Sequence, residues 1–588
     1  MGLLIAAVGV LSACGNDDSA PSQDFEPRYT APAGAERGGT LTVLSSSDID
    51  SLDPGVTINQ FGMMISQATQ RTLLMLAPDA EHKLVPDLAR EMPQVDYEGG
   101  TVTFRIRPGV RFSSPVDREV EAGDFKYAIE RSLLPGVANG YVSSYLNGLV
   151  GFGRAQQAAI SNPKKAPDIA GVTAPDDRTL ELRFHGRVPP MAIAVLALPL
   201  GAPVPADYAR PFDAEIPSTY DQHLVATGPY MVPNDASGKL TGYHPGVETE
   251  MVRNPDWDPD LDTRPAYLDK VEIESGYSNT AAASRKILSG EGLVNGDFVP
   301  DPPMLEYAAT ERPDQLDMVS AGAALYATLN TTIPPLDDPD VRRAILAATD
   351  REAIRLVRGG QIVGPLATHF IPPGVNGFED AGGLEGSGFD FLGNPHGNAS
   401  LAAEYMKRAG FPDGKYEGDA ELNMVSDSTA VGRRVAELVR QAIDSLGIPV
   451  RVRAVARDVM YSRYCNVPRA EVAICPNVGW LSLLGDPQTV LAEAFSGDAI
   501  RQVNNSNWSQ LDDPKINRQI RRAQWIVDPA GRAEAWGSID REITGLAPAI
   551  PLVWSKVPFV FSTDVDLVID RTTASPSLAL TSLAGGGD

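Results

Sequence analysis

Hydrophobic and polar residues alternate in three short stretches, with the two-residue period of a half-buried β-strand. The stretches are residues 40–44, 101–106 and 179–184. Their apolar faces carry, in chain order, Leu41 and Val43, then Val102, Phe104 and Ile106, then Leu180, Leu182 and Phe184. We expect a strand in each stretch, with the folded body beginning near residue 38.

Other stretches repeat with the 3.6-residue period of a helix. One covers residues 122–133, and another covers 338–360, where an aspartate precedes the apolar stripe and two glycines end it. The clearest runs over 431–446, stops at Gly447, and is followed by strand-like alternation over 448–454. A helix that leads directly into a strand is the αβ unit of a layered sheet. The pattern therefore predicts an α/β protein.

The N-terminal apolar run ends at a cysteine. It is about ten residues long, half of what a membrane-spanning helix needs, and it fits the apolar region of a signal peptide. Residues 11–14, Leu-Ser-Ala-Cys, match the bacterial lipobox, in which the chain is cleaved before the cysteine and its thiol receives a lipid. We expect a signal peptide over 1–13 and lipidation at Cys14. The alternative is a buried helix with an incidental cysteine.

Residues 14–37 are polar, rich in Pro and Gly, and without periodicity, which predicts a flexible tether. With a lipid on Cys14, the folded body is expected on the outer face of the bacterial cytoplasmic membrane, at the cell surface or on the periplasmic side.

Composition narrows the range of partners. At 588 residues the chain can form several packed units, and its net charge of −26 repels phosphate backbones, so we expect no nucleic-acid partner. If Cys14 carries lipid, Cys465 and Cys475 remain in an oxidising compartment. A disulfide between them and two buried free thiols both fit the sequence.

The motifs of the common enzyme classes are missing from the sequence. It contains no H-E-x-x-H, no G-x-S-x-G, no phosphate-binding G-x-x-x-x-G-K-[ST] and no G-x-G-x-x-G, and its six histidines have no metal-ligand spacing. We expect no metal and no cofactor. A hydrolase that uses unrecognised carboxylates stays open as an alternative.

Several segments, in the same order along the chain, resemble those of one family. They are residues 38–55, 84–116, 122–133, 226–232, 252–259, 329–354, 402–414, 478–487 and 548–554. Together they resemble the extracytoplasmic solute-binding proteins of ABC transporters, family 5, the dipeptide, oligopeptide and nickel-binding type.

The resemblance implies a two-lobed periplasmic-binding-protein-like fold of the class II type, with an extra domain and with hinge strands between the lobes. Residues 38–58, 185–275 and 557–588 would form the core of lobe 1. Residues 59–184 would form an additional domain on that lobe, and residues 276–556 would form lobe 2.

The same resemblance implies a ligand enclosed between the lobes. From lobe 2 the expected contacts are Trp480, Leu481, Ser482 and Leu483, and from lobe 1 they are Asn59, Gln60 and Phe61. Each group has a plainer interpretation: a core tryptophan at a sheet edge, and the solvated start of a helix.

Two residues bear on the kind of ligand. Peptide binders of this family carry an aspartate for the peptide's α-ammonium where this chain has Leu483, and an unpaired buried ammonium would cost several kcal/mol. A peptide with a free amino terminus is therefore disfavoured. His369 lies near the hinge and could ligate a metal complex, although a lone histidine is more often structural.

The resulting hypothesis is a non-enzymatic lipoprotein, a monomer, that captures a peptide-like or other organic solute and delivers it to a membrane permease. The alternatives are the secreted hydrolase and a surface chaperone or adhesion lipoprotein with a degenerate cleft.

Overall fold

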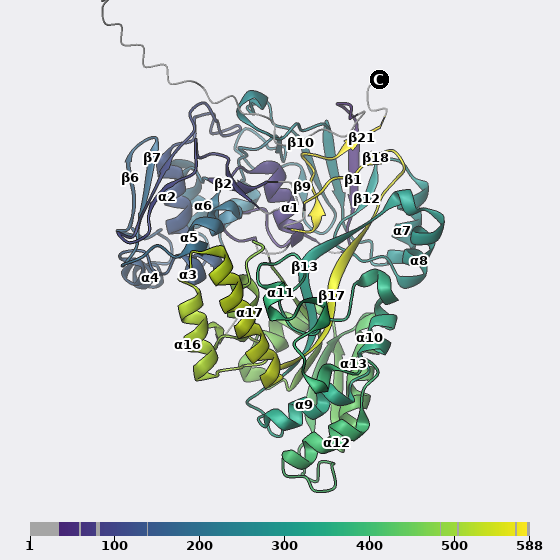
Figure 1. The fold of residues 1–588 in the computed structure, drawn as a ribbon. Helices are drawn as coiled ribbons and strands as arrows, with labels where there is room; N and C mark the ends of the chain where they lie inside the picture. The colour runs from purple at the N-terminus through teal and green to yellow at the C-terminus, as the bar shows by residue number, and fades with distance from the viewer. Residues whose placement is uncertain are drawn as a thin grey trace, which may run out of the picture.

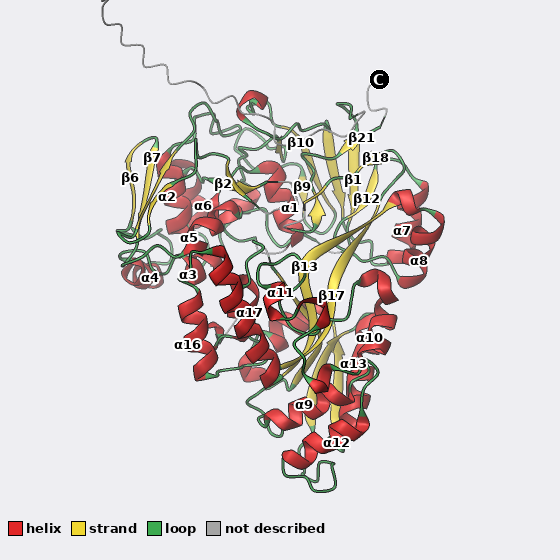
Figure 2. Ribbon diagram, viewed as in Figure 1, coloured by secondary structure: helices red, strands yellow, loops and turns green. Residues whose placement is uncertain are grey.

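The computed structural model describes residues 35–46, 48–57, 60–77, 83–137, 139–482, 484–502, 505–570 and 573–584. The predicted signal peptide, the lipidation residue Cys14, and two of the expected ligand contacts, Asn59 and Leu483, lie outside these ranges. The protein has an upper and a lower lobe, and two long strands run from one to the other (Figure 1). Helices and strands occur in both lobes (Figure 2), which confirms the predicted α/β class.

The upper lobe is built on a six-stranded mixed sheet with the order β12-β1-β11-β10-β8, in which β9 also pairs with β10. Its strands are β1 (Thr40–Leu44), β8 (Tyr230–Met231), β9 (Tyr243–His244), β10 (Glu248–Arg253), β11 (Lys270–Glu274) and β12 (Leu293–Asn295). The predicted strand over 40–44 is confirmed, with Leu41 and Val43 fully buried. Helix α1 (Gln60–Thr69) packs in the same core.

A second module of the upper lobe carries a four-stranded antiparallel sheet with the order β4-β5-β7-β6. Its strands are β4 (Gln94–Asp96), β5 (Thr101–Arg105), β6 (Val172–Asp176) and β7 (Thr179–Arg183), beside the hairpin β2 (Leu74–Leu76) and β3 (Leu84–Pro86). Its helices are α2 (Ala122–Arg131), α3 (Gly140–Tyr145), α4 (Phe152–Ser161), α5 (Pro190–Ala194) and α6 (Ala206–Asp213). The predicted apolar faces of β5 and β7 meet in its core.

The lower lobe contains a five-stranded sheet with the order β15-β14-β16-β13-β17. Its strands are β13 (Leu316–Leu329), β14 (Leu422–Asp427), β15 (Val450–Val455), β16 (Ile474–Leu481) and β17 (Ala549–Val560). The helices are α9 (Pro339–Ala348), α10 (Arg351–Arg358), α11 (Phe378–Ala381), α12 (Ala399–Arg408), α13 (Ala430–Asp444), α14 (Arg457–Met460), α15 (Gln488–Phe495), α16 (Pro514–Ala523) and α17 (Pro529–Leu546). The predicted helix–strand unit appears as α13 followed by β15.

The stretch 338–360 forms two helices, α9 and α10, where the sequence pattern predicts one. The break falls at Thr349 and Asp350. The side chain of Asp350 accepts a hydrogen bond from the backbone N–H of Ala353, so it caps the second helix.

Strands β13 and β17 connect the lobes. They pair over most of their length, and a register shift between Ser320 and Ala323 leaves Gly322 unopposed with a φ of +58°. A bulge of this kind bends a strand, and glycine tolerates the left-handed backbone. Beyond the bulge, β17 reaches the upper lobe, where Val560 joins the buried cluster that contains Leu44.

The predicted lobe boundaries differ from the structure at two points. Helices α7 (Thr280–Ser289) and α8 (Pro302–Glu311) flank β12, which pairs in parallel with β1, so residues 280–311 belong to the upper lobe (Figure 1). Helix α1, expected in the additional domain, packs in the core around β1. The local alternation of side chains predicts a strand, but it does not specify which sheet the strand joins.

The C-terminal segment adds two short pairs to the upper lobe, β18 (Val565–Asp566) with β21 (Ser582–Leu583), and β19 (Ile569–Asp570) with β20 (Ser575–Pro576). Cys465 and Cys475 form a disulfide in the lower lobe, with their Cα atoms 6.3 Å apart. None of the described helices is both long and apolar enough to cross a membrane.

Candidate functional site

Strand β16 carries the predicted ligand contacts to the upper edge of the lower-lobe sheet. It runs parallel to β14, so both strands end at the edge from which β17 continues into the upper lobe. In open α/β sheets, ligands bind outside the carboxyl ends of the strands. The structure therefore places Trp480 and Leu481 at the edge where a ligand site is expected.

Trp480 is half-buried and held in one orientation. Its indole N–H donates to the backbone carbonyl of Thr489 at 2.6 Å, and its ring meets Trp508 edge-on at a centroid distance of 5.7 Å. Ser482 is buried, and its hydroxyl shares a hydrogen bond with Thr489 Oγ1 at 3.1 Å. Leu481 is half-buried. Because the indole donor is engaged within the protein, Trp480 can offer a ligand only an apolar ring surface.

The turn that follows β16 contains one acidic residue, Asp486, which is paired within the protein. Asp486 forms a two-point ion pair with Arg532, whose Nε and Nη2 lie 2.7 and 2.8 Å from its carboxylate oxygens. Arg532 is 4% exposed and also donates to Gln488 Oε1. The charge of Asp486 is thus neutralised within the lower lobe, and this carboxylate is not presented to a ligand ammonium.

The same turn touches the upper lobe. Leu484, only 8% exposed, joins the buried apolar cluster of the second module, which includes Tyr145 and Leu146 beside α3. Arg501 Nη2 donates to Ser144 Oγ at 3.0 Å across the same boundary. Apolar burial and a hydrogen bond therefore hold the lobes together here.

The expected contacts of the upper lobe lie at the start of α1. Gln60 donates from Nε2 to the carbonyl of Ala574 at 2.6 Å, and Phe61 packs against Gly296, where a Cβ atom would come within 2.7 Å of its ring. Both side chains are half-buried. Among the described residues, no hydrogen bond joins either of them to residues 480–482.

His369 is structural. It is fully buried, with Nδ1 2.9 Å from Asp540 Oδ2 and Nε2 3.2 Å from the carbonyl oxygen of Gly383. Both ring nitrogens are occupied, so neither can ligate a metal. The side chains that the structure describes include no cluster of three or more His, Cys, Asp or Glu suited to a metal ion.

A polar group that sequence reasoning missed lies beside β16. Arg358, the last residue of α10, donates to Asn477 Oδ1, and Asn477 Nδ2 donates to Asp427 Oδ2 at 2.7 Å. Asp427 is the last residue of β14. In the sequence, an arginine near the end of a helix is typical of a solvated surface, so nothing in the sequence distinguishes Arg358 as a functional residue.

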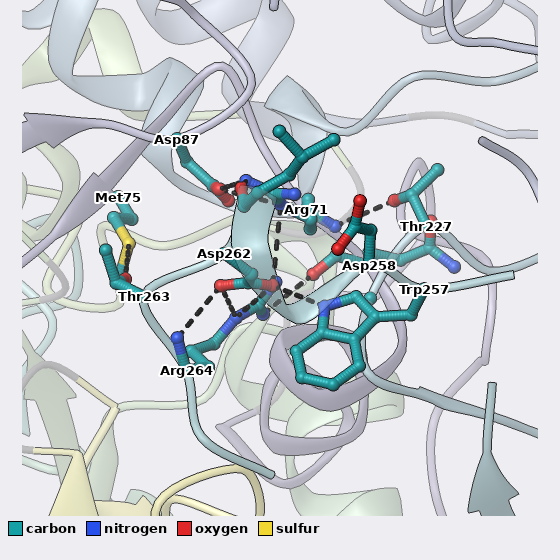
Figure 3. Close-up of polar contacts among 12 residues, drawn as sticks. Arg71, Met75, Asp87, Thr227, Trp257, Asp258, Asp262, Thr263 and Arg264 are labelled. Atoms are coloured by element: carbon teal, nitrogen blue, oxygen red, sulfur yellow. Dashed lines mark hydrogen bonds and ion pairs between the residues drawn. The ribbon is translucent and has the colours of Figure 1, made fainter. Parts of the chain in front are cut away.

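A separate cavity of about 90 Å³ lies within the upper lobe, between α1 and a C-terminal segment that contributes Asp570, Thr573 and residues 577–580. Beside it, Arg264 and Arg71 pair with Asp262 and Asp87 (Figure 3). Burial alone would raise the pKa of Asp262, but the guanidinium charges of Arg264 and Arg71 outweigh that effect and hold the pKa well below its usual range. Arg264 also donates to the carbonyl of Gln67, so the network fixes the end of α1.

Two lobes joined by a pair of crossing strands, with a site expected between them, define the class of two-lobed binding proteins. A family model for bacterial extracellular solute-binding proteins, family 5, matches residues 83–502, and the chain belongs to this family.

Curated relatives and solved structures of binding proteins are similar to this chain over most of its length. Di/tripeptide-binding protein 3 of Pseudomonas aeruginosa is 23% identical over 482 residues, covering 81% of this chain and 82% of the relative. The oligopeptide-binding protein OppA of Bacillus subtilis is 23% identical over 546 residues, covering 90% and 89%. The structure is similar to clavulanic acid biosynthesis oligopeptide binding protein 2, with a TM-score of 0.79, 25% identity, and coverage of 95% and 100%. It is also similar to the murein tripeptide binding protein MppA of Escherichia coli, with a TM-score of 0.74, 17% identity, and coverage of 94% and 99%.

Proposed function

We propose that this chain is the solute-binding component of an ABC importer, which captures a peptide-like or other organic solute between its lobes and delivers it to a membrane permease. The observation that carries the proposal is the pair of crossing strands, β13 and β17, with a bulge at Gly322. Membership of the family supports it.

Hinge closure is the proposed mechanism. A ligand that contacts both lobes favours the closed form by the difference between its affinities for the closed and open forms. The segment that carries Trp480 and Ser482, the end of β16 and the turn after it, also carries Leu484, which packs against the upper lobe. Ligand binding and lobe contact thus share one segment. Trp480, Leu481, Ser482 and Leu483 are proposed to contact the ligand from below, and Asn59, Gln60 and Phe61 from above.

The proposed ligand lacks a free ammonium group at the Leu483 end. The aspartate that would bind an ammonium is replaced by Leu483, and Asp486 is neutralised by Arg532. Relatives are named for dipeptides, tripeptides and oligopeptides. For this chain, we propose an amino-blocked peptide or another organic solute.

Lipid on Cys14 is proposed to hold the protein at the outer face of the cytoplasmic membrane. An anchor raises the effective concentration of the binding protein at its permease without any new contact. The protein is proposed to act as a monomer and without catalysis.

A thermal-shift screen of peptides with free and acetylated amino termini, and of other organic solutes, tests the proposal. Binding hits are expected to be recovered unchanged and to weaken about tenfold or more with Trp480→Ala, because an aromatic contact is lost. Trp525→Ala is the control, since Trp525 is 39% exposed on the surface. Conversion of a compound to product would favour a hydrolase, and a screen without hits would favour a chaperone or adhesion role.

A further inference from the structure

Arg358 has no acidic partner among the described side chains. No described carboxylate oxygen lies within 4.0 Å of its guanidinium, whereas Arg355, one turn earlier on α10, pairs with Glu352 at 2.7 Å. The hydrogen-bond acceptor that the structure gives Arg358 is the amide oxygen of Asn477. A guanidinium has five N–H donors, so most of its donor capacity is unused within the described residues.

Asn477 separates Arg358 from the nearby carboxylate of Asp427. That carboxylate accepts hydrogen bonds from Asn477 Nδ2 and from the backbone and hydroxyl groups of Thr429, at the start of α13. The positive charge of Arg358 is therefore left for another anion.

Strand β16 is irregular at this point. Tyr326 of β13 pairs with Val478 and Thr328 pairs with Cys475, so Pro476 and Asn477 together stand opposite Ala327. Bulges of this kind re-aim a side chain and are frequent beside functional sites. The bulge gives Asn477 the direction in which it meets Arg358.

The surroundings favour a bound anion. Burial, together with the positive charge of Arg457, lowers the pKa of Arg358 to about 10, while Asp427 and Tyr461 act in the opposite sense. The exposed Arg457 begins the adjacent α14, and the half-buried Tyr461 directly follows that helix. An unpaired cation in a partly desolvated place is unfavourable unless an anion joins it.

Arg358 lies near the edge of the lower-lobe sheet at which a ligand is expected to bind. Asp427 is the last residue of β14, and Met424 of β14 pairs with Ile474 of β16, which sets Asp427 level with Asn477. Strand β16 continues for four more residues, to Leu481. Arg358 thus lies at the carboxyl ends of parallel strands, just below the predicted ligand contacts.

We propose that Arg358, positioned by Asn477, binds an anionic group of the ligand, a carboxylate in the simplest case, at the lower-lobe end of the site. This inference rests on the proposed solute-binding function. It narrows the ligand to an organic anion: a molecule with an apolar body for Trp480, a carboxylate for Arg358 and no ammonium at the Leu483 end.

The test compares matched acids and amides. N-acetylated dipeptides and small organic acids, each paired with its carboxamide, are titrated into the full chain by calorimetry. Acids are expected to bind and their amides to bind at least tenfold more weakly. Arg358→Gln is expected to weaken acid binding about 10- to 100-fold, the size of a lost charge-assisted hydrogen bond, and to leave amide binding unchanged. The matched control is Arg355→Gln on the same helix.

A second measurement needs no ligand. If Arg358 serves a ligand, Arg358→Gln leaves the unfolding midpoint of the ligand-free protein unchanged or higher, because a desolvated unpaired cation is removed. A lowered midpoint would show that Arg358 is structural and would overturn the inference. Equal binding of acids and amides, or acid binding that Arg358→Gln leaves intact, would overturn it as well while solute binding stands. If no compound of either kind binds, the proposed function itself fails.

Discussion

The contact of Leu484 with the upper lobe gives the sharpest prediction about closure. Leu484 lies in the turn after β16, close in the chain to Trp480 and Ser482, and it is 8% exposed because it is buried in the cluster beside α3. When the lobes separate, this side chain returns to water. Leu484→Ala therefore destabilises the closed form more than the open form.

The magnitude follows from the atoms removed. Leucine to alanine deletes three carbon groups, worth about 0.8 kcal/mol each when buried, or about 2.4 kcal/mol in total. If all of this free energy is lost from the closed form and none from the open form, ligand affinity weakens about 60-fold. Partial contact of Leu484 with its own lobe reduces this, so a loss between about 10- and 60-fold is expected.

Calorimetry with the best hit of the solute screen measures the affinity, and small-angle scattering measures the radius of gyration with and without that ligand. The variant is expected to need more ligand to reach the same compact form. Leu356→Ala, at a residue 62% exposed in the lower lobe, is the control and should leave both quantities unchanged. Full affinity in Leu484→Ala would refute the idea that lobe contact at this turn is coupled to ligand binding.

Two further predictions concern stability. Replacing Cys465 and Cys475 together by serine opens a loop with a sequence separation of 10 and should lower the free energy of unfolding in urea by about 3 kcal/mol; an unchanged midpoint would show that the bond contributes nothing. Asp262→Asn leaves Arg264, whose side chain is only 11% exposed, without its carboxylate and should cost about 3–5 kcal/mol at neutral pH. The pKa of Asp262 is lowered in the folded state, so its contribution is full above the unfolded value of about 4 and declines as the pH falls below it. The difference between Asp262→Asn and the natural chain should therefore shrink in acid, and a constant difference from pH 7 to pH 3 would contradict the ion-pair explanation.

Local sequence patterns predicted many elements because periodicity is set by neighbouring residues. The strand at Leu41 and Val43, the pair β5 and β7, and the α13–β15 unit all follow from alternation or a helical stripe. Sheet membership was not predictable in this way. Nothing local shows that β12 pairs with β1, because that pairing depends on contacts between residues 251 apart in the chain, such as Leu44 with Asn295.

The sequence predicted which residues would form the candidate site, but not how their side chains are arranged. The resemblance pointed to Trp480, but the hydrogen bond to Thr489 that fixes its ring depends on how α15 folds back on β16. The burial of Leu484 in the upper lobe joins residues far apart in the chain. Arg358 was missed because its distinguishing feature is that no carboxylate among the described residues pairs with it, and no local sequence pattern records such a feature.

Mass spectrometry of the chain from residue 15 onward, first native and then denatured, tests solute binding most directly. The binding-protein hypothesis predicts one released small molecule per chain, an organic anion without a free ammonium, which raises the melting temperature of the stripped protein when it is added back. A released peptide with a free amino terminus would contradict the inference from Leu483. A chain that releases nothing and that no member of the solute screen stabilises would contradict the central claim.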